Sequence, residues 1–220
     1  ELVLCWKASM EGERCQENPE FGEQVESISN EFLEYLPTLR EVLSEDVEAI
    51  LRGDPASVSK REIVLAYPGL QAVSVFRIAH FLHQRGVPLI PRIMTEHIHS
   101  KTGIDIHPGV SIGRGLMIDH GTGIVIGETA VIKDQVRLYQ GVTLGALSPQ
   151  HSLVNPDLKR HPTIENNVTV YAGATILGDV VVGEGSIIGG NVWLTHSIPP
   201  NSRVFLKDAD SVQEERVKAS

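Results

Sequence analysis

The second half of the chain carries an aliphatic residue at every sixth position. The series pauses once for two extra residues and once for a longer insertion, and it resumes after each. Its members are Ile106, Ile112, Ile118, Ile126, Ile132, Leu138, Leu144, Ile164, Val170, Ile176, Val182, Ile188 and Leu194. A short fixed period of this kind is typical of a solenoid, in which each repeat buries its apolar face only against its neighbours.

The hexapeptide period predicts the geometry of the solenoid. Six residues supply one short strand and a turn, and three such units close a triangular coil of about eighteen residues. The repeated aliphatic side chain then points inward and stacks on its equivalent in the next coil. Glycine recurs at the expected corners, as in 112–115 and 182–185, where it adopts a positive φ at little cost. We therefore expect a parallel β-helix of a little more than about four coils.

The first half instead shows the spacing of α-helices. Apolar residues at steps of three and four between positions 23 and 51 form one helix face, with Pro37 as a break or kink. Ser59 and Glu62 have the spacing of an N-terminal capping box. Further helices are expected over 60–66, 70–85 and 90–100.

Together these patterns predict the α+β class, with an N-terminal helical domain followed by a β-helix of hexapeptide repeats. A polar, proline-containing loop at 146–161 should project from the β-helix. The expected domains are an N-terminal segment without fixed structure (1–20), a helical oligomerisation domain (21–102), a catalytic β-helix domain (103–200) and a C-terminal tail (201–220).

Composition excludes several classes of protein. The 220 residues carry a net charge of −9, so the chain lacks the basic stripe that a nucleic-acid-binding protein needs. No apolar run approaches the length of about 18 residues that a membrane span requires. Two cysteines are too few for a disulfide scaffold, and the first residues do not resemble a signal peptide. We therefore expect a cytoplasmic protein.

Departures from a regular repeat are where function is to be sought. The first departure places Asp119 and His120 in a glycine-rich turn. Asp105 lies nearly one coil earlier, so its carboxylate can lie one rung from His120. A carboxylate there would fix the tautomer of an acid–base histidine. The alternative is a surface pair without function.

The second departure, the insertion at 146–161, ends in Lys159, Arg160 and His161. Two cations and a histidine can hold an anion such as a carboxylate or a phosphate; the alternative is a solvated loop end. His97 and His99 could suggest a metal, but no cysteine or acidic cluster completes a ligand set, so we expect no metal.

Several motifs, taken together, resemble serine O-acetyltransferase, a family of the hexapeptide-repeat acyltransferase superfamily. The resemblance runs from about Asp54 to Pro200 and implies a left-handed β-helix. The motifs are Asp105–Pro108, Ile112–Gly115, Ile118–Gly123, Val125–Ala130 and Arg160–Pro162, with Tyr67–Ala72 and Phe76–His80 upstream. The family transfers an acetyl group from acetyl-CoA to the hydroxyl of L-serine, which gives O-acetyl-L-serine for cysteine biosynthesis.

The resemblance also implies a role for each matching residue. His120 resembles the general base of the family, and Asp105 resembles the carboxylate that orients it. The implied serine-binding residues are Asp54 and Asp119 for the ammonium group, and Arg160 and His161 for the carboxylate. An amino acid needs both an anionic and a cationic anchor, and these residues supply both.

For acetyl-CoA the resemblance implies a groove between neighbouring β-helices, and hence a homotrimer or a dimer of trimers. The implied lining residues are Gly145, Ala146 and Ala172. Ala146 stands where the family usually has a glycine. The chain ends in Ser220 and not in the isoleucine that the family docks into O-acetylserine sulfhydrylase, so we do not expect that complex.

Three other functions fit the same scaffold. A hexapeptide acetyltransferase for a sugar or an amino alcohol would keep the base but would not need Asp54, Asp119 and Arg160. A γ-class carbonic anhydrase would need three histidine ligands, for which His107 and His161 could join His120. A β-helix used only for assembly would need no base.

Overall fold

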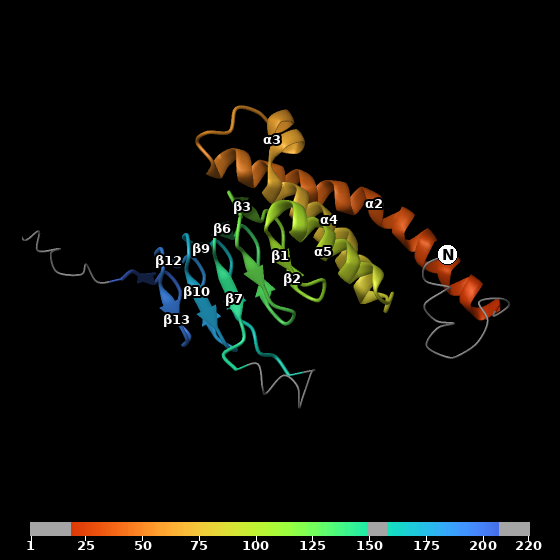
Figure 1. The fold of residues 1–220 in the computed structure, drawn as a ribbon. Coiled ribbons are helices and arrows are strands. Elements are labelled where there is room, and N and C mark those ends of the chain that lie inside the picture. Colours follow the sequence, from red (N-terminus) through yellow and green to blue (C-terminus); the bar gives the residue numbers. More distant parts are fainter. Residues whose placement is uncertain (1–18, 149–157, 207–220) are drawn as a thin grey trace, which may run out of the picture.

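The computed structural model describes residues 19–148 and 158–206, and it places a layer of helices on one end of a β-helix (Figure 1). Our expectations for 1–18, 149–157 and 207–220 lie outside the described residues. The helices are α2 (Pro19–Gly53), α3 (Lys60–Ala66), α4 (Pro68–Gln84) and α5 (Ile90–Thr102).

Short strands follow the helices and build the solenoid. They are β1 (Asp105–Ile106), β2 (Ser111–Ile112), β3 (Met117–Asp119), β4 (Val125–Ile126), β5 (Val131–Ile132), β6 (Arg137–Tyr139), β7 (Thr143–Gly145), β8 (Thr163–Ile164), β9 (Thr169–Val170), β10 (Thr175–Leu177), β11 (Val181–Val182), β12 (Ile187–Ile188), β13 (Trp193–Leu194) and β14 (Arg203–Val204).

The strands form three parallel sheets, which are the three faces of the β-helix. Face A contains β1, β4, β7, β10 and β13; face B contains β2, β5, β8 and β11; face C contains β3, β6, β9, β12 and β14. The chain visits the faces in the order A, B, C and then climbs to the next coil. This topology confirms the solenoid that the hexapeptide period predicts.

The predicted aliphatic series fills the interior of the β-helix. All its members are buried except Ile112, which is partly buried. Ile112 lies on β2, the terminal strand of face B. Helix α5 covers β1, and α2 and α4 cover β3, so those first strands are shielded. Each buried side chain of this size stabilises the fold by about 1.5–3 kcal/mol.

The strand register confirms both departures from the repeat. Asp105 pairs with Val125, whereas Val125 pairs with Thr143, so the first coil is two residues longer than the second. Thr143 then pairs with Thr175 on the next rung of face A, and the insertion lies between them.

The helices agree with the sequence except at Pro37 and in one detail of a cap. Helix α2 continues through Pro37, so the helix does not break there, and the expected kink stays a prediction. Pro37 is exposed, so solvent can bind the carbonyl that has lost its N–H partner. The Ser59 hydroxyl accepts from the Glu62 N–H at 3.2 Å, as a capping box requires. The Glu62 carboxylate accepts from the Val58 N–H at 2.8 Å and not from Ser59.

A buried ion pair joins the helical layer to the first coil. Arg77 on α4 donates to both carboxylate oxygens of Asp46 on α2, at 2.8 and 2.9 Å, and to the Gly113 carbonyl at 2.8 Å. Asp46 also accepts from the Leu116 N–H at 2.9 Å. Burial raises the pKa of Asp46, and Arg77 opposes that effect. The pair therefore fixes two helices against the β-helix.

Two glycines let the helices approach face C closely. A Cβ at Gly53 would lie 2.1 Å from the Met117 sulfur, and one at Gly69 would lie 2.5 Å from the Ile118 carbonyl oxygen. The end of α2 and the start of α4 therefore lie directly on β3, which brings the residue after Gly53 close to the first departure from the repeat.

Across residues 19–148 and 158–206, no single helix is long and apolar enough to cross a membrane, although the bent pair α3–α4 meets that test by length and composition.

Candidate active site

His120 lies at the centre of a tight turn at the corner between faces C and A. Its φ is 58°, and the Gly121 N–H donates to the Asp119 carbonyl at 2.7 Å, which closes a γ-turn. This positive-φ form is strained for a residue other than glycine, and such strain is typical of functional sites. The turn presents an imidazole that is 71% exposed.

Two carboxylates accompany His120 at this corner. Asp119 Oδ1 lies 3.8 Å from His120 Nε2. Asp54, directly after α2, accepts from the Tyr67 hydroxyl at 2.6 Å through Oδ2 and from the Ala56 N–H at 2.8 Å through Oδ1. The hydrogen bond to Asp54 is the main reason that the pKa of Tyr67 rises to about 12, and the charge of Asp119 adds to the effect. We call Asp54, Tyr67, Asp119 and His120 the acidic half of the site.

Asp105 lies on β1, which is one coil before β4, the strand that follows the His120 turn. It begins β1 and pairs with Val125. The Gly123 N–H donates to the Gly103 carbonyl at 2.8 Å, so the turn stacks on the segment just before Asp105. Contact between the Asp105 carboxylate and the His120 ring stays a prediction.

Arg160 and His161 lie at the other edge of face A, at the corner with face B. Arg160 donates to the Glu128 carboxylate. His161 is 7% exposed, and its Nδ1 lies 3.1 Å from the Thr129 nitrogen and 2.8 Å from the Thr129 hydroxyl. Burial first, and then the Arg160 charge, lower the pKa of His161 to about 4. We call Glu128, Thr129, Arg160 and His161 the basic half of the site.

A cavity of about 380 Å³ opens over the basic half. Asp105, Ala146, Arg160 and His161 all line it, so the structure brings four of the predicted residues to one wall. Glu128 lines it as well. The cavity therefore offers charges of both signs to a small polar ligand.

The residues implied for CoA are divided between the two edges of face A. Gly145 ends β7, and Ala146 follows it on the wall of the cavity. A Cβ at Gly145 would lie 2.8 Å from Leu177 Cδ2. Ala172 lies at the corner between faces C and A, where its carbonyl accepts from the Asn191 N–H at 2.9 Å. Their role in binding CoA stays a prediction.

The serine-binding residues are divided in the same way. The acidic half lies at the C–A edge of face A and the basic half at the A–B edge. Between these edges the chain runs from Gly123 to Gly127, a span of about 13 Å along one strand. This backbone separation is several times the reach of a hydrogen bond, which is about 3 Å.

Sequence reasoning did not single out Tyr67, Glu128 or Thr129 as site residues. Glu128 and Thr129 come two and three positions after an aliphatic member of the repeat, Ile126, and occupy an ordinary corner. Their partners Arg160 and His161 are more than thirty positions away, beyond the insertion. The one local signal was the insertion itself, which ends beside the corner that these two residues form.

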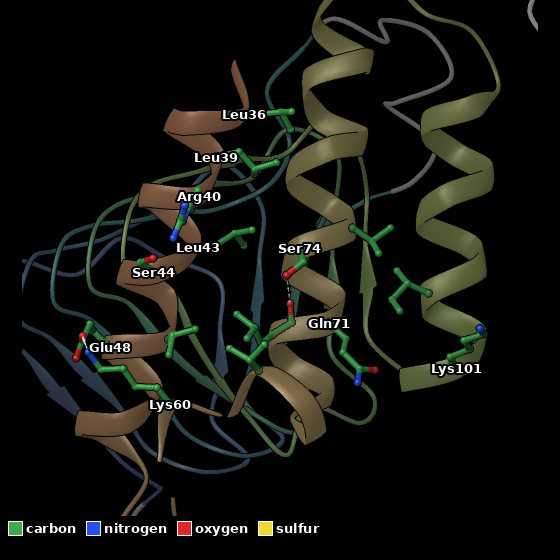
Figure 2. Close-up of a pocket in the computed structure, with 15 residues that line it drawn as sticks. Leu36, Leu39, Arg40, Leu43, Ser44, Glu48, Lys60, Gln71, Ser74 and Lys101 are labelled. Carbon is green, nitrogen blue, oxygen red and sulfur yellow. Dashed lines mark hydrogen bonds and ion pairs between the residues drawn. The ribbon is translucent and has the colours of Figure 1, made fainter. Parts of the chain in front are cut away.

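A larger hollow of about 930 Å³ lies among the helices and is not the candidate active site (Figure 2). Aliphatic side chains such as Leu36, Leu39 and Leu43 of α2 line most of it. Two of its polar contacts are local: Lys60 pairs with Glu48, and the Ser74 hydroxyl donates to the Leu70 carbonyl at 2.7 Å. None of the predicted site residues is among those that line it.

Within the part of the chain that the structure describes, no three His, Cys, Asp or Glu side chains are grouped so that they could hold a metal ion.

The fold and the repeat define a hexapeptide-repeat protein. Residues 161–196 match the family model for the bacterial transferase hexapeptide (six repeats). Among curated proteins, a serine acetyltransferase of Helicobacter pylori (strain 26695) is 43% identical over 174 residues, which are 79% of this chain and 98% of that protein. The chain belongs to the serine acetyltransferase family.

Other relatives agree with this family. The plasmid serine acetyltransferase of Synechococcus elongatus is 51% identical over 82% of this chain, and the chain spans 57% of the length of that relative. The crystal structure of Entamoeba histolytica serine acetyltransferase isoform 3 in complex with cysteine has a TM-score of 0.79 and 43% identity, covering 86% of this chain and 66% of that one. The likeness confirms the predicted left-handed β-helix.

Proposed function

We propose that this chain transfers the acetyl group of acetyl-CoA to the hydroxyl of L-serine and so makes O-acetyl-L-serine for cysteine biosynthesis. The observation that carries the proposal is the pair of complementary half-sites on face A, in a chain of the serine acetyltransferase family. Three solved relatives support the choice of acceptor. Those of Neisseria gonorrhoeae and soybean were crystallised with serine, and that of Entamoeba histolytica with cysteine.

The proposed chemistry begins with the exposed imidazole of His120. As general base it removes the proton from the serine hydroxyl, and Asp105 orients the ring and stabilises the imidazolium. The alkoxide attacks the thioester carbonyl, the C–S bond breaks, and the proton returns from His120 to the CoA thiolate. Asp54 and Asp119 hold the serine ammonium group next to the base. Arg160 and His161 hold the serine carboxylate.

The working site is formed between chains. Because the two halves lie at opposite edges of face A, the acidic half of one protomer meets the basic half of the next. A closed ring of three copies makes three such contacts, each head to tail. We therefore propose a homotrimer as the minimal active unit, with acetyl-CoA in the groove between protomers lined by Gly145, Ala146 and Ala172. A dimer of trimers made through the helical layer is compatible with this unit.

Thiol release from acetyl-CoA by the purified protein tests the reaction. We expect release that depends on L-serine and is much slower with homoserine, ethanolamine or simple sugars. Release with another acceptor only would replace the substrate but keep the acyltransferase chemistry. No release with any acceptor would contradict the proposed function.

Mixing two variants tests the shared site. His120→Ala lacks the base, and Arg160→Ala lacks the carboxylate anchor. In trimers co-expressed from both, some interfaces combine an intact acidic half with an intact basic half. At serine concentrations below the wild-type KM we expect about a quarter of wild-type activity from random mixing, well above either variant alone. No gain on mixing would contradict a site formed between chains.

A further inference from the structure

Thr129 ties the end of the insertion to the corner between faces A and B. Its hydroxyl oxygen accepts from the Arg160 N–H at 2.9 Å and from the His161 N–H at 3.1 Å. A threonine hydroxyl has two acceptor sites and one proton. Both acceptor sites are therefore used by the backbone, and the proton is left for a different acceptor.

That acceptor is Nδ1 of His161, which lies 2.8 Å from the Thr129 hydroxyl oxygen. The Thr129 backbone N–H also donates to this nitrogen, at 3.1 Å. A backbone N–H can only donate, so Nδ1 must present a lone pair. A neutral imidazole with a lone pair on Nδ1 carries its proton on Nε2.

The His161 ring packs on Gly127, and both residues lie on the wall of the cavity. A Cβ at Gly127 would be 2.0 Å from Nε2, so the ring occupies the space that any side chain at this position would fill. Gly127 and His161 both line the cavity, next to Arg160. The free ring N–H is therefore offered at the same wall as the guanidinium.

We propose that Thr129 is a positioning residue, which fixes His161 in the neutral Nε2–H tautomer so that the ring presents only an N–H donor to the cavity. Such a donor selects a ligand atom that accepts hydrogen bonds, and a carboxylate oxygen beside Arg160 fits it best. That this carboxylate belongs to serine rests on the proposed function. The assignment of the tautomer does not depend on the proposed function.

The state of the ring agrees with this assignment. The lowered pKa of His161 keeps the imidazole neutral near pH 7. The charged and titratable groups that act on it are Arg160, Lys159 and His107, which disfavour a second proton, and Glu128, which favours one. A neutral Nε2–H ring cannot serve as a base toward the cavity, so this histidine binds while His120 carries out the proton transfer.

Nitrogen NMR of the histidine-labelled protein tests the tautomer without any assay of activity. The chain has nine histidines, and His161→Gln identifies the signals of this ring by their loss. We expect an unprotonated Nδ1 and a protonated Nε2 in the wild type and in Thr129→Ser, which keeps the hydroxyl. In Thr129→Val we expect both nitrogen signals to move toward values averaged between tautomers. A protonated Nδ1 in the wild type would overturn the proposal.

Kinetics of the same variants test the consequence. We expect Thr129→Val to raise the serine KM about tenfold, the equivalent of one hydrogen bond to a charged group, and to leave the KM for acetyl-CoA unchanged. Thr129→Ser should restore the wild-type serine KM. If Thr129→Val acted by loosening the fold in general, both KM values would rise, and Thr129→Ser would not restore them. Thr169→Val is the matched control, because it removes a half-buried hydroxyl on face C that makes no side-chain hydrogen bond within the described residues.

The experiments distinguish a failure of the proposed function from a failure of the role assigned to Thr129. If the nitrogen signals are as expected but thiol release does not depend on serine, the role assigned to Thr129 stands and L-serine is not the substrate. If the wild type acetylates serine but Thr129→Val has wild-type nitrogen signals and a wild-type serine KM, the proposed function stands and the role assigned to Thr129 is wrong.

Discussion

The Tyr67 hydroxyl donates a 2.6 Å hydrogen bond to Oδ2 of Asp54, and this bond joins the start of α4 to the residue that follows α2. Asp54 Oδ1 is held at the same time by the Ala56 N–H. The carboxylate therefore has a fixed orientation in the acidic half of the site. Because the pKa of Tyr67 is raised to about 12, the phenol keeps its proton and the bond persists at any pH suited to the assay.

Tyr67→Phe should therefore raise the serine KM. Loss of one hydrogen bond that orients a carboxylate corresponds to about a three- to tenfold increase, with a smaller change in kcat. Steady-state kinetics with varied serine measure this effect. Tyr35→Phe is the control, since Tyr35 stacks on Phe81 in the helical layer, away from the acidic half. Equal effects of the two substitutions would show that Tyr67 acts through helix packing alone.

His120→Ala should lower turnover by two or more orders of magnitude, a typical contribution of a general base. The side chain is 71% exposed, so its removal should leave the melting temperature within a few degrees of wild type. His97→Ala, an exposed histidine on α5, should have no effect on turnover. Turnover of His120→Ala close to that of the wild type would remove His120 from the reaction.

Arg160→Ala should raise the serine KM more than it lowers kcat. The guanidinium is held by Glu128 in the basic half, so it is already placed for an incoming carboxylate. An interaction that binds the substrate and the transition state equally appears mainly in KM. Arg61→Ala, on the exposed surface of α3, is the control for loss of a positive charge. An unchanged serine KM in Arg160→Ala would exclude this residue from the site.

The ion pair of Asp46 and Arg77 should dominate the attachment of the helices to the β-helix. Arg77→Met leaves a buried carboxylate without its partner and should cost about 3–5 kcal/mol of unfolding free energy. The double variant Asp46→Leu with Arg77→Met should regain part of that loss. Lys60→Met breaks an exposed pair with Glu48 and should cost less than about 1 kcal/mol. Urea denaturation measures all three, and a loss in Arg77→Met as small as that in Lys60→Met would contradict this role.

His161 should make the fold sensitive to mild acid. Its pKa is about 4 in the folded protein, below the ordinary value of 6.5, so between these values the unfolded chain binds more protons than the native one. The stability that this residue contributes is complete above pH 6.5 and is lost as the pH falls toward 4, by up to about 3 kcal/mol. Unfolding free energies from pH 7 to pH 4 should fall less steeply in His161→Gln. Identical slopes would contradict a buried neutral ring.

Much of the fold followed from the sequence because its period is short and strict. The aliphatic residue in every hexad can be buried only if each strand stacks on its equivalent one coil away, so the series from Ile106 to Leu194 was sufficient to predict the solenoid. The two extra residues near His120 were equally visible, because any insertion shifts the phase of such a series. Helix α2 was predicted less well, since the sequence alone did not show that the backbone at Pro37 lies in solvent.

Contacts between segments far apart in the chain were decided only by the tertiary structure. Thr129 and His161 are separated by the whole insertion, and the direction of each hydrogen bond between them depends on a corner geometry that no local pattern encodes. The same holds for Tyr67 and Asp54, which meet because the start of α4 lies beside the end of α2. A periodic sequence determines which side chains are buried, because burial repeats with the period. It does not determine which polar groups meet at the corners, because each of those contacts forms once.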